Sequence, residues 1–284
     1  NQINPAIAVD STDKVYVVWE DDQNSDKDIY IASSTNSFST QVTTRITSAI
    51  YDQTTPDIAV DSYDTVYVVW ADARSWNGKG NPMYDFYGAA SNNSWTNTLI
   101  VTEDDQQSSP KISTEADGTV LHFVWLDDTP GDDDVYYATS NGLPLPGNPL
   151  TGSSIIDEAG ADQLSPVIAT TGSTGNGLEV FVCWRDERNA EAELYAVETT
   201  ANGTNIYVGN DFTTDDQSQP AIGIDQYDHP YLVWINGRTD ICYAGSTYTD
   251  PDALASENVS MSLGATVGTE PASISSIDDV SAEV

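Results

Sequence analysis

The sequence predicts an all-β protein, a five-bladed β-propeller built from four-stranded antiparallel blades and followed by a C-terminal tail. The first observation is a repeated string, typified by YDQTTPDIAVDSYDTVYVVWADAR from Tyr51 to Arg74, which occurs in five copies. The second is the period, because a tryptophan recurs every 50 to 59 residues, at Trp19, Trp70, Trp125, Trp184 and Trp234. The third is that no segment has a sustained helical period. Repetition at this length is typical of solenoids and propellers.

Each copy predicts four short strands. The first strand follows a proline, and the second, such as Val15 to Trp19, is apolar on both faces and must therefore be covered on both sides. The third begins with an acidic residue and carries a tyrosine, and the fourth is shorter and more polar, as an outermost strand should be. Sheets that cover one another in this way form a propeller. We expect one propeller domain over residues 1–267, with repeats near 1–51, 52–104, 105–161, 162–215 and 216–267.

The charge of the chain excludes some partners. The formal net charge is -36, with only 9 lysines and arginines, so nucleic-acid binding by counterion release is excluded. The same charge argues against docking on anionic lipid, and no apolar run is long enough to insert into a membrane. The chain begins without Met, at Asn1, on the first residue of a repeat. We interpret this as a mature protein whose signal peptide has been removed, which predicts an extracellular or cell-surface location.

Two cysteines interrupt the repeat. Cys183 replaces the valine that precedes the tryptophan in the other copies, and Cys242 replaces the tyrosine of the third strand. Because the two departures fall in neighbouring units, one prediction is a disulfide between units four and five. The alternative is two buried thiols that act as small apolar side chains.

The string P-x-I-A-V-D-S-x-D-x-V-Y-V-V-W-x-D-x-R, followed by D-I-Y, resembles the repeats of secreted bacterial and archaeal propellers that are grouped loosely with sialidase-like proteins. The resemblance covers nearly all of residues 1–249 and implies a fold and an extracellular address. The sialidase Asp-box reads S-x-D-x-G-x-T-W. Ser62 and Asp64 match its start, but Val66 stands where the pattern has Gly. No position matches a sialidase nucleophile or acid, so the resemblance implies no reaction.

Repeated charged residues form the first group of candidate ligand-binding positions. The turn after the second strand carries Asp72 and Arg74 in unit two, Asp186 and Arg188 in unit four, and Arg238 in unit five. One interpretation is an acidic ring with three arginines that grip a carboxylate-bearing sugar. The other is that each arginine pairs with a nearby aspartate and holds the blades together.

Departures from the repeat form the second group of candidates. The enlarged loop of unit two offers Trp76, an aromatic side chain that could stack on a sugar ring. Asp57 and Lys111 occupy the second place of the innermost strand, where other copies have Ala or Val, and could line the mouth of the channel. The alternatives are a loop without a function and a bridge between two blades.

No cofactor is required by any motif, and calcium is the one metal that the residues suggest. Asp22, Asn24, Asp26 and Asp28 alternate oxygen ligands as calcium loops do, but Lys27 stands where an EF-hand has Gly. A solvated acidic turn is the alternative. Three N-x-S/T sequons, at Asn92, Asn202 and Asn258, fall between third and fourth strands and predict exposed glycosylation sites.

Two classes of function remain open. The leading hypothesis is a non-catalytic extracellular or cell-surface propeller that binds glycans or other surface partners, or that assembles into a filament or layer. The alternative is a sialidase-like or arabinanase-like propeller glycosidase or lyase. Such an enzyme needs two carboxylates about 5 to 10 Å apart at the channel mouth, and Asp57 with an aspartate of a neighbouring loop is the pairing we would test.

The tail 268–284 resembles the opening of a sixth repeat. Pro271 follows Pro220 by 51 residues, which is the repeat spacing. One hypothesis is that the tail adds a strand to a sheet edge, either within its own molecule or on a neighbour, which would give self-assembly. The other is a disordered linker.

Overall fold

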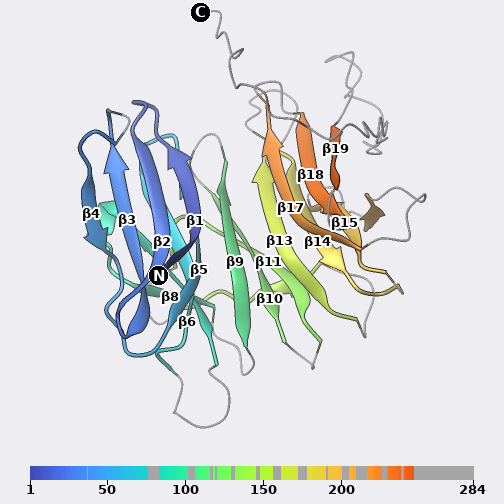
Figure 1. Ribbon diagram of the computed structural model, residues 1–284, viewed down its shortest axis with the longest axis horizontal. Helices are drawn as coiled ribbons and strands as arrows, with labels where there is room; N and C mark the ends of the chain where they lie inside the picture. Colours follow the sequence, from blue (N-terminus) through green and yellow to red (C-terminus); the bar gives the residue numbers. More distant parts are fainter. Residues whose placement is uncertain are drawn as a thin grey trace, which may run out of the picture.

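The computed structural model shows an all-β protein with one short 3-10 helix, η1 (Ser91–Asn93), in its described part (Figure 1). No helix in that part is long and apolar enough to cross a membrane. The structure describes residues 1–36, 38–75, 83–101, 106–115, 118, 120–128, 132–144, 148–155, 161–171, 178–189, 191–199, 205–208, 216–225, 229–237 and 240–245.

The strands form five antiparallel sheets, and in each sheet neighbouring strands follow one another in the chain. The blades contain the following strands: blade 1, β1 (Gln2–Val9), β2 (Val15–Asn24), β3 (Asp26–Ser34) and β4 (Val42–Arg45); blade 2, β5 (Gln53–Val60), β6 (Val66–Asp72), β7 (Asp85–Ala90) and β8 (Thr98–Val101); blade 3, β9 (Gln107–Thr114), β10 (Leu121–Asp127), β11 (Asp134–Ser140) and β12 (Ser153–Ser154); blade 4, β13 (Gln163–Thr170), β14 (Val180–Asp186), β15 (Glu193–Glu198) and β16 (Ile206–Tyr207); blade 5, β17 (Gln217–Ile224), β18 (Pro230–Asn236) and β19 (Asp240–Gly245).

The predicted fold, a five-bladed propeller with four-stranded antiparallel blades, is confirmed. The first strand of each repeat is the innermost strand of its blade, and in blades 1 to 4 the fourth is the outermost. Three strands of blade 5 are described, while its expected fourth strand and the tail 268–284 lie outside the described residues. The outermost strands β12 and β16 are only two residues long.

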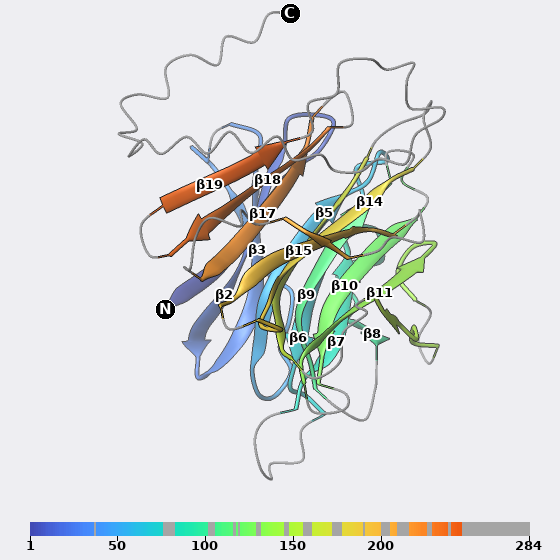
Figure 2. The ribbon, with the colours of Figure 1, turned by 90° about the vertical axis from the view of Figure 1, so that its right-hand side faces the viewer.

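The core lies between blades rather than within one sheet. Trp70, Trp125 and Trp184 are fully buried because each blade covers the second strand of its neighbour. Every side chain of β6 and of β10 is buried, which explains why these strands are apolar on both faces. Figure 2, turned by 90° from Figure 1, shows β9, β10 and β11 running alongside one another as one twisted layer. The stacking of such layers places the five innermost strands around a common centre (Figure 1).

Candidate functional site

The innermost strands share a bulge that shapes the centre of the propeller. In every blade the register between the first and second strands shifts next to the proline. The residue before that proline has a positive φ between 49° and 53° in all five blades, although none of them is glycine. Such backbone is rare for side-chain-bearing residues. The residues are Asn4, Thr55, Ser109, Ser165 and Gln219.

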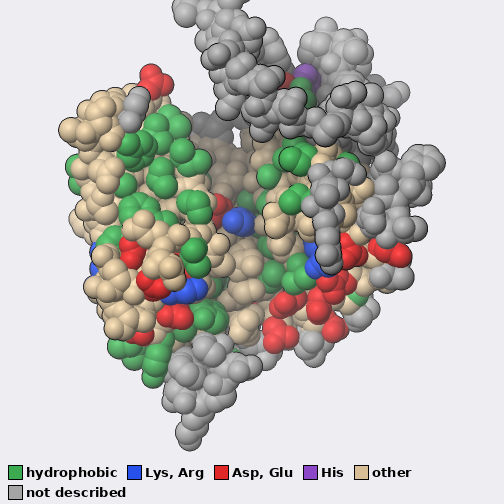
Figure 3. Space-filling view, in the orientation of Figure 1, with side chains coloured by type: hydrophobic (Ala, Val, Ile, Leu, Met, Phe, Trp, Pro, Cys, Tyr) green, Lys and Arg blue, Asp and Glu red, His purple; other side chains and the backbone are tan. Residues whose placement is uncertain are grey.

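Four of these polar residues line a central cavity of about 300 Å³ to which all five innermost strands contribute. Figure 3 shows the cavity as a hollow between the two flanks of the molecule, with basic and acidic side chains side by side at its floor. The wall is therefore made of hydroxyl, amide and proline groups with one lysine. Its lining residues are Asn4, Pro5, Ala6, Thr55, Pro56, Ser109, Lys111, Ser165, Pro166, Val167 and Pro220.

Lys111 and Asp57 supply the charge at this cavity. The Lys111 Nζ lies 3.9 Å from the Asp57 Oδ1, and the Ile112 N–H donates to the Asp57 Oδ2 at 2.9 Å. Burial raises the pKa of the Asp57 carboxyl, while Lys111 and the Ile112 N–H oppose that rise. The Lys111 side chain remains 32% exposed and the Asp57 side chain 19% exposed. The pair thus bridges blades 2 and 3 and also leaves the ammonium accessible from the channel.

A second carboxylate lies behind the wall of the cavity. Glu20 is buried, and its Oε1 accepts the Thr55 N–H at 2.7 Å and the Asn4 Nδ2 at 2.5 Å. The Lys27 Nζ lies 3.0 Å from its other oxygen. Glu20 therefore fixes the bulges of blades 1 and 2, and it is held away from the cavity by three donors.

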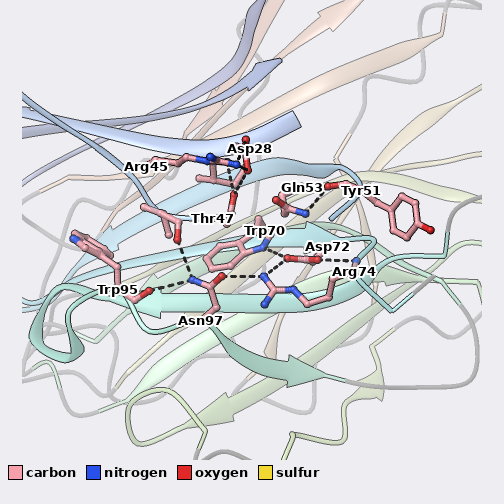
Figure 4. Close-up of polar contacts among 12 residues, drawn as sticks. Asp28, Arg45, Thr47, Tyr51, Gln53, Trp70, Asp72, Arg74, Trp95 and Asn97 are labelled. Carbon is pink, nitrogen blue, oxygen red and sulfur yellow. Dashed lines mark hydrogen bonds and ion pairs between the residues drawn. The ribbon is translucent and has the colours of Figure 1, made fainter. Parts of the chain in front are cut away.

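The predicted arginine ring is engaged in the structure. Asp72 is fully buried and accepts the Trp70 Nε1 at 2.7 Å, the Arg74 N–H at 2.9 Å and the Arg74 Nη2 at 2.5 Å (Figure 4). The same Nη2 donates to the Asn97 Oδ1 at 2.9 Å, and the guanidinium lies 4.2 Å from the Tyr87 ring centroid. The Asn97 amide in turn donates to the Ile46 carbonyl of blade 1.

Asp186 and Arg188 repeat the arrangement in blade 4. The Asp186 carboxylate accepts the Arg188 Nε and Nη2, both at 2.8 Å, and the Trp184 Nε1 at 3.0 Å. Burial alone would raise the pKa of Asp186, but the hydrogen bonds from Arg188 and Trp184 outweigh it and the pKa is lowered. The pairing interpretation therefore fits both described arginines better than a ring that grips a ligand. Trp76 and Arg238 lie outside the described residues.

Of the four residues of the predicted calcium loop, the three aspartates have partners outside the loop, and Asn24 donates to one of them. Asp22 accepts the N-terminal ammonium, and Asp26 accepts the Tyr51 N–H at 3.3 Å. Asp28 is buried and accepts the Arg45 Nη2 at 2.7 Å (Figure 4). The Asn24 Nδ2 donates to the Asp28 Oδ2 at 3.3 Å. Over the described part of the chain, no group of three or more His, Cys, Asp and Glu is arranged to hold a metal ion. Calcium binding stays a prediction.

Both cysteines lie in described strands of neighbouring blades. Cys183 and Cys242 lie in one apolar cluster between blades 4 and 5, as the repeat alignment predicts. Both are thiols in the structure, so the predicted disulfide is not observed there. Burial raises the pKa of the Cys183 thiol, which makes it a poor nucleophile.

Of the three sequons, the structure describes one. Asn92 lies exposed in η1, and its glycosylation stays a prediction, while Asn202 and Asn258 lie outside the described residues.

Sequence reasoning placed Lys111 at the channel and missed the residues before the prolines. A signal was present, since the residue before the proline is polar in every repeat. The sequence pattern does not reveal the positive φ of these residues, which turns their side chains toward the centre.

Comparison with known proteins supports the fold. No family model matches the chain, and no curated protein matches it in sequence. A protein of unknown function from Dyadobacter fermentans shares 9% identity, with a TM-score of 0.60 over 86% of this chain and 78% of that one. An ulvan lyase bound to -[GlcA(1-4)Rha3S]- shares 12% identity, with a TM-score of 0.57 over 88% and 73%. An endo-arabinase from Bacteroides thetaiotaomicron shares 12% identity, with a TM-score of 0.53 over 87% and 94%. The chain thus has a propeller fold similar to that of glycoside hydrolases and polysaccharide lyases.

Proposed function

We propose that this protein is a non-catalytic extracellular or cell-surface propeller that binds a glycan in its central cavity. One observation carries the proposal: the described part of the cavity wall offers hydroxyl and amide groups and one lysine–aspartate pair, and no two carboxylates of the described lining face each other. Most enzymes that hydrolyse a glycosidic bond use such a pair of carboxylates. Binding of a sugar needs only fixed donors and acceptors in a concave site.

The charge of the chain favours a neutral glycan over an acidic one. A net charge of -36 repels anionic polymers at low salt. Lys111 is the one cation of the described cavity lining, and its pairing with Asp57 weakens its attraction for a carboxylate. The pair can still donate from Nζ and accept at a carboxylate oxygen, which matches the paired donor and acceptor of a sugar hydroxyl.

The similar structures support a saccharide as the ligand class. Two of them are an endo-arabinase and an ulvan lyase, and those activities belong to those proteins. At 12% identity the likeness extends to the fold, and the same fold hosts many functions. The extracellular location is part of the proposal and is supported by the acidic composition and by the resemblance of the repeats to those of secreted propellers.

A propeller glycosidase or lyase is the second candidate. It is favoured by Asp57, because burial raises the pKa of its carboxyl as a general acid requires. A second carboxylate near the wall, Glu20, is already held by Asn4, Thr55 and Lys27. Catalysis by Asp57 would therefore need Glu20 to be released or another carboxylate to take part.

Binding and turnover should be measured with the same protein. A glycan array with neutral and acidic oligosaccharides is combined with a panel of polysaccharides, including arabinan and ulvan, in which new reducing ends and unsaturated products are followed. We expect retention of a neutral glycan without turnover. Lys111→Gln should weaken that binding about tenfold, because a charge-assisted hydrogen bond is lost.

Lys14→Gln is the matched control, since Lys14 lies at the far end of blade 1 over the Tyr16 ring and lines no part of the cavity. An equal loss of affinity in both variants would contradict a site at the channel. Turnover by the wild type that disappears in Asp57→Asn would replace the binding function with an enzymatic one.

A further inference from the structure

Four interfaces between consecutive blades are built in the same way. We call the side of a blade that faces the next blade its leading face, and the opposite side its trailing face. In the first interface the leading face of blade 1 packs against the trailing face of blade 2. The leading residues there are Tyr16, Val18, Ile29 and Ile31, and the trailing residues are Ile58, Val68, Trp70 and Ala89. Equivalent residues form the clusters between blades 2 and 3, 3 and 4, and 4 and 5.

No described residue covers the leading face of blade 5 in this way. Tyr231 is 47% exposed, Val233 is 42% exposed and Ile241 is 69% exposed. Their equivalents in blade 1, Tyr16, Val18 and Ile29, are 8%, 0% and 0% exposed. Because the sequence of blade 5 keeps apolar residues at these positions, the face has the chemistry of an interface.

The trailing face of blade 1 is uncovered in the same way. Ile3, Ile7 and Val9 are 43%, 66% and 54% exposed, whereas Ile58, the equivalent of Ile7, is 7% exposed. An apolar groove of about 450 Å³ runs along this face and is lined by Gln2, Ile3, Pro5, Val17, Trp19, Ala32, Phe38 and Gln41. Figure 3 shows hydrophobic side chains on both flanks of the hollow. We call the space between these two uncovered faces the seam.

Chain topology assigns an occupant to the seam. At each of the four described transitions the chain leaves an outermost strand and enters the innermost strand of the next blade, β5, β9, β13 or β17. That innermost strand always lies beside the innermost strand of the preceding blade. A segment that continues the repeat after blade 5 must therefore begin beside β17, on the uncovered leading face.

We propose that residues 268–284 enter the seam as a sixth innermost strand, between β17 and β1. Pro271 continues the series of strand prolines, which lie 51 to 56 residues apart, and follows Pro220 by 51 residues. A polar residue, Glu270, precedes it, as in every other repeat. Beyond it, Ala272 and Ile274 alternate with Ser273 and Ser275, so an extended strand presents one apolar side.

Two arguments favour the chain's own segment over a second copy. The segment is tethered to blade 5 by residues 246–267, which gives it an effective concentration on the order of millimolar at the seam. A second copy would have to approach against its own net charge of -36. The seam is thus closed from within one molecule, although two copies could in principle exchange the segment.

Disulfide trapping tests the placement. In a background with Cys183→Val and Cys242→Ala, the pair Ile7→Cys and Ile274→Cys should form a bond within one chain on mild oxidation, detected as a faster monomer band without reductant. The control pair Tyr63→Cys and Ile274→Cys should not, because Tyr63 is 74% exposed in a turn of blade 2, away from the seam. Equal trapping in both pairs, or bonds mainly between chains, would overturn the proposal.

Hydrogen exchange on the protein with its native cysteines gives a second and independent readout. Deletion of residues 268–284 should increase exchange of the β1 amides at least tenfold, while the β9 amides, which lie away from the seam, should be unaffected. The same exchange in β1 with and without the segment would overturn the placement, even if the cysteine variants failed to fold.

Discussion

The turn that follows the second strand carries different charges in blades 3 and 4. In blade 4 the buried Asp186 accepts two hydrogen bonds from Arg188 at 2.8 Å, as well as the Trp184 Nε1 at 3.0 Å. In blade 3 the equivalent Asp127 is also buried, but it accepts the Trp125 Nε1 and the Gln107 Nε2 at 3.3 and 3.4 Å. The chain there continues with Asp128 and Thr129, where blade 4 has Glu187 and Arg188.

The difference shows that the turn forms with or without the arginine. What the arginine provides is a positive charge that offsets the buried carboxylate. The pKa of Asp186 is lowered despite its burial, because Arg188 and Trp184 stabilise the ionised form. In blade 3, burial and the nearby Asp132, Asp127 and Asp133 raise the pKa of Asp134 to about 6. In blade 4 the ionised Asp186 therefore stabilises the folded state, whereas in blade 3 the ionised Asp134 destabilises it.

The largest effect is expected from removal of the arginine in blade 4. Arg188→Met leaves the fully buried Asp186 without its cation, and breaking a buried pair in this way costs roughly 3 to 5 kcal/mol. Urea unfolding at neutral pH would measure the loss. The double variant Asp186→Asn with Arg188→Met should recover much of it, because the buried charge is then removed as well.

Arg185→Gln is the control for this experiment. Arg185 pairs with Glu187 at 2.6 Å, but the Glu187 side chain is 40% exposed, so the pair should contribute about 1 kcal/mol or less. Equal losses for the two arginine variants would mean that burial of Asp186 has no energetic consequence, and the contrast between the blades would disappear.

The next effect has the opposite sign and belongs to blade 3. Asp134→Asn should stabilise the protein by about 1 kcal/mol at neutral pH, a value reduced for partial exposure to solvent. The Oδ1 of Asp134 is buried and has no hydrogen-bond partner among the described residues, so no hydrogen bond is lost at that atom. Melting temperatures of the wild type and the variant at several pH values would measure the gain.

The pH dependence of that gain follows from the direction of the shift. A carboxyl whose pKa is raised in the folded state, from 3.8 to about 6, binds a proton more tightly when folded. Its destabilising contribution is therefore full above the folded pKa and fades as the pH falls toward the unfolded value. The two proteins should be equally stable near pH 4, within about 0.3 kcal/mol. A constant difference across this range would contradict the assignment to Asp134.

The sequence predicts the blades well, because each blade repeats a local pattern that is compatible with only one arrangement of strands. Val66 to Trp70 is apolar on both faces, and Asp72 follows a tryptophan that can donate to it. The position of Lys111 at the channel is predictable for the same reason, since it directly follows the proline of an innermost strand. These features depend on alternation and on neighbours in the chain, which the sequence displays directly.

Features that depend on the whole ring were not predictable in this way. Ile7 and Ile58 occupy the same place in the repeat, yet one is exposed and the other is buried, because only the latter has a blade packed against it. Arg74 could equally have faced a ligand, and its position is decided by the Tyr87 ring and Asn97, which belong to distant parts of the repeat. The sequence does not rank such alternatives.

The smallest effect expected is the response to salt, and it sharpens the comparison of the two blades. With a net charge of -36, the folded state repels itself, and blade 3 concentrates that repulsion around Asp134. Raising NaCl from about 0.01 M to about 1 M shortens the Debye length from about 30 Å to about 3 Å. The wild-type melting temperature should therefore rise, with a local contribution of roughly a few tenths of a kcal/mol from blade 3.

Because Asp134→Asn removes part of the repulsion beforehand, the melting temperature of this variant should rise less with salt. The melting temperature of Arg185→Gln should rise at least as much as that of the wild type. Identical salt responses in the wild type and Asp134→Asn would show that the acidic side chains of blade 3 do not act on one another, and the repulsion would then have to be spread evenly over the propeller.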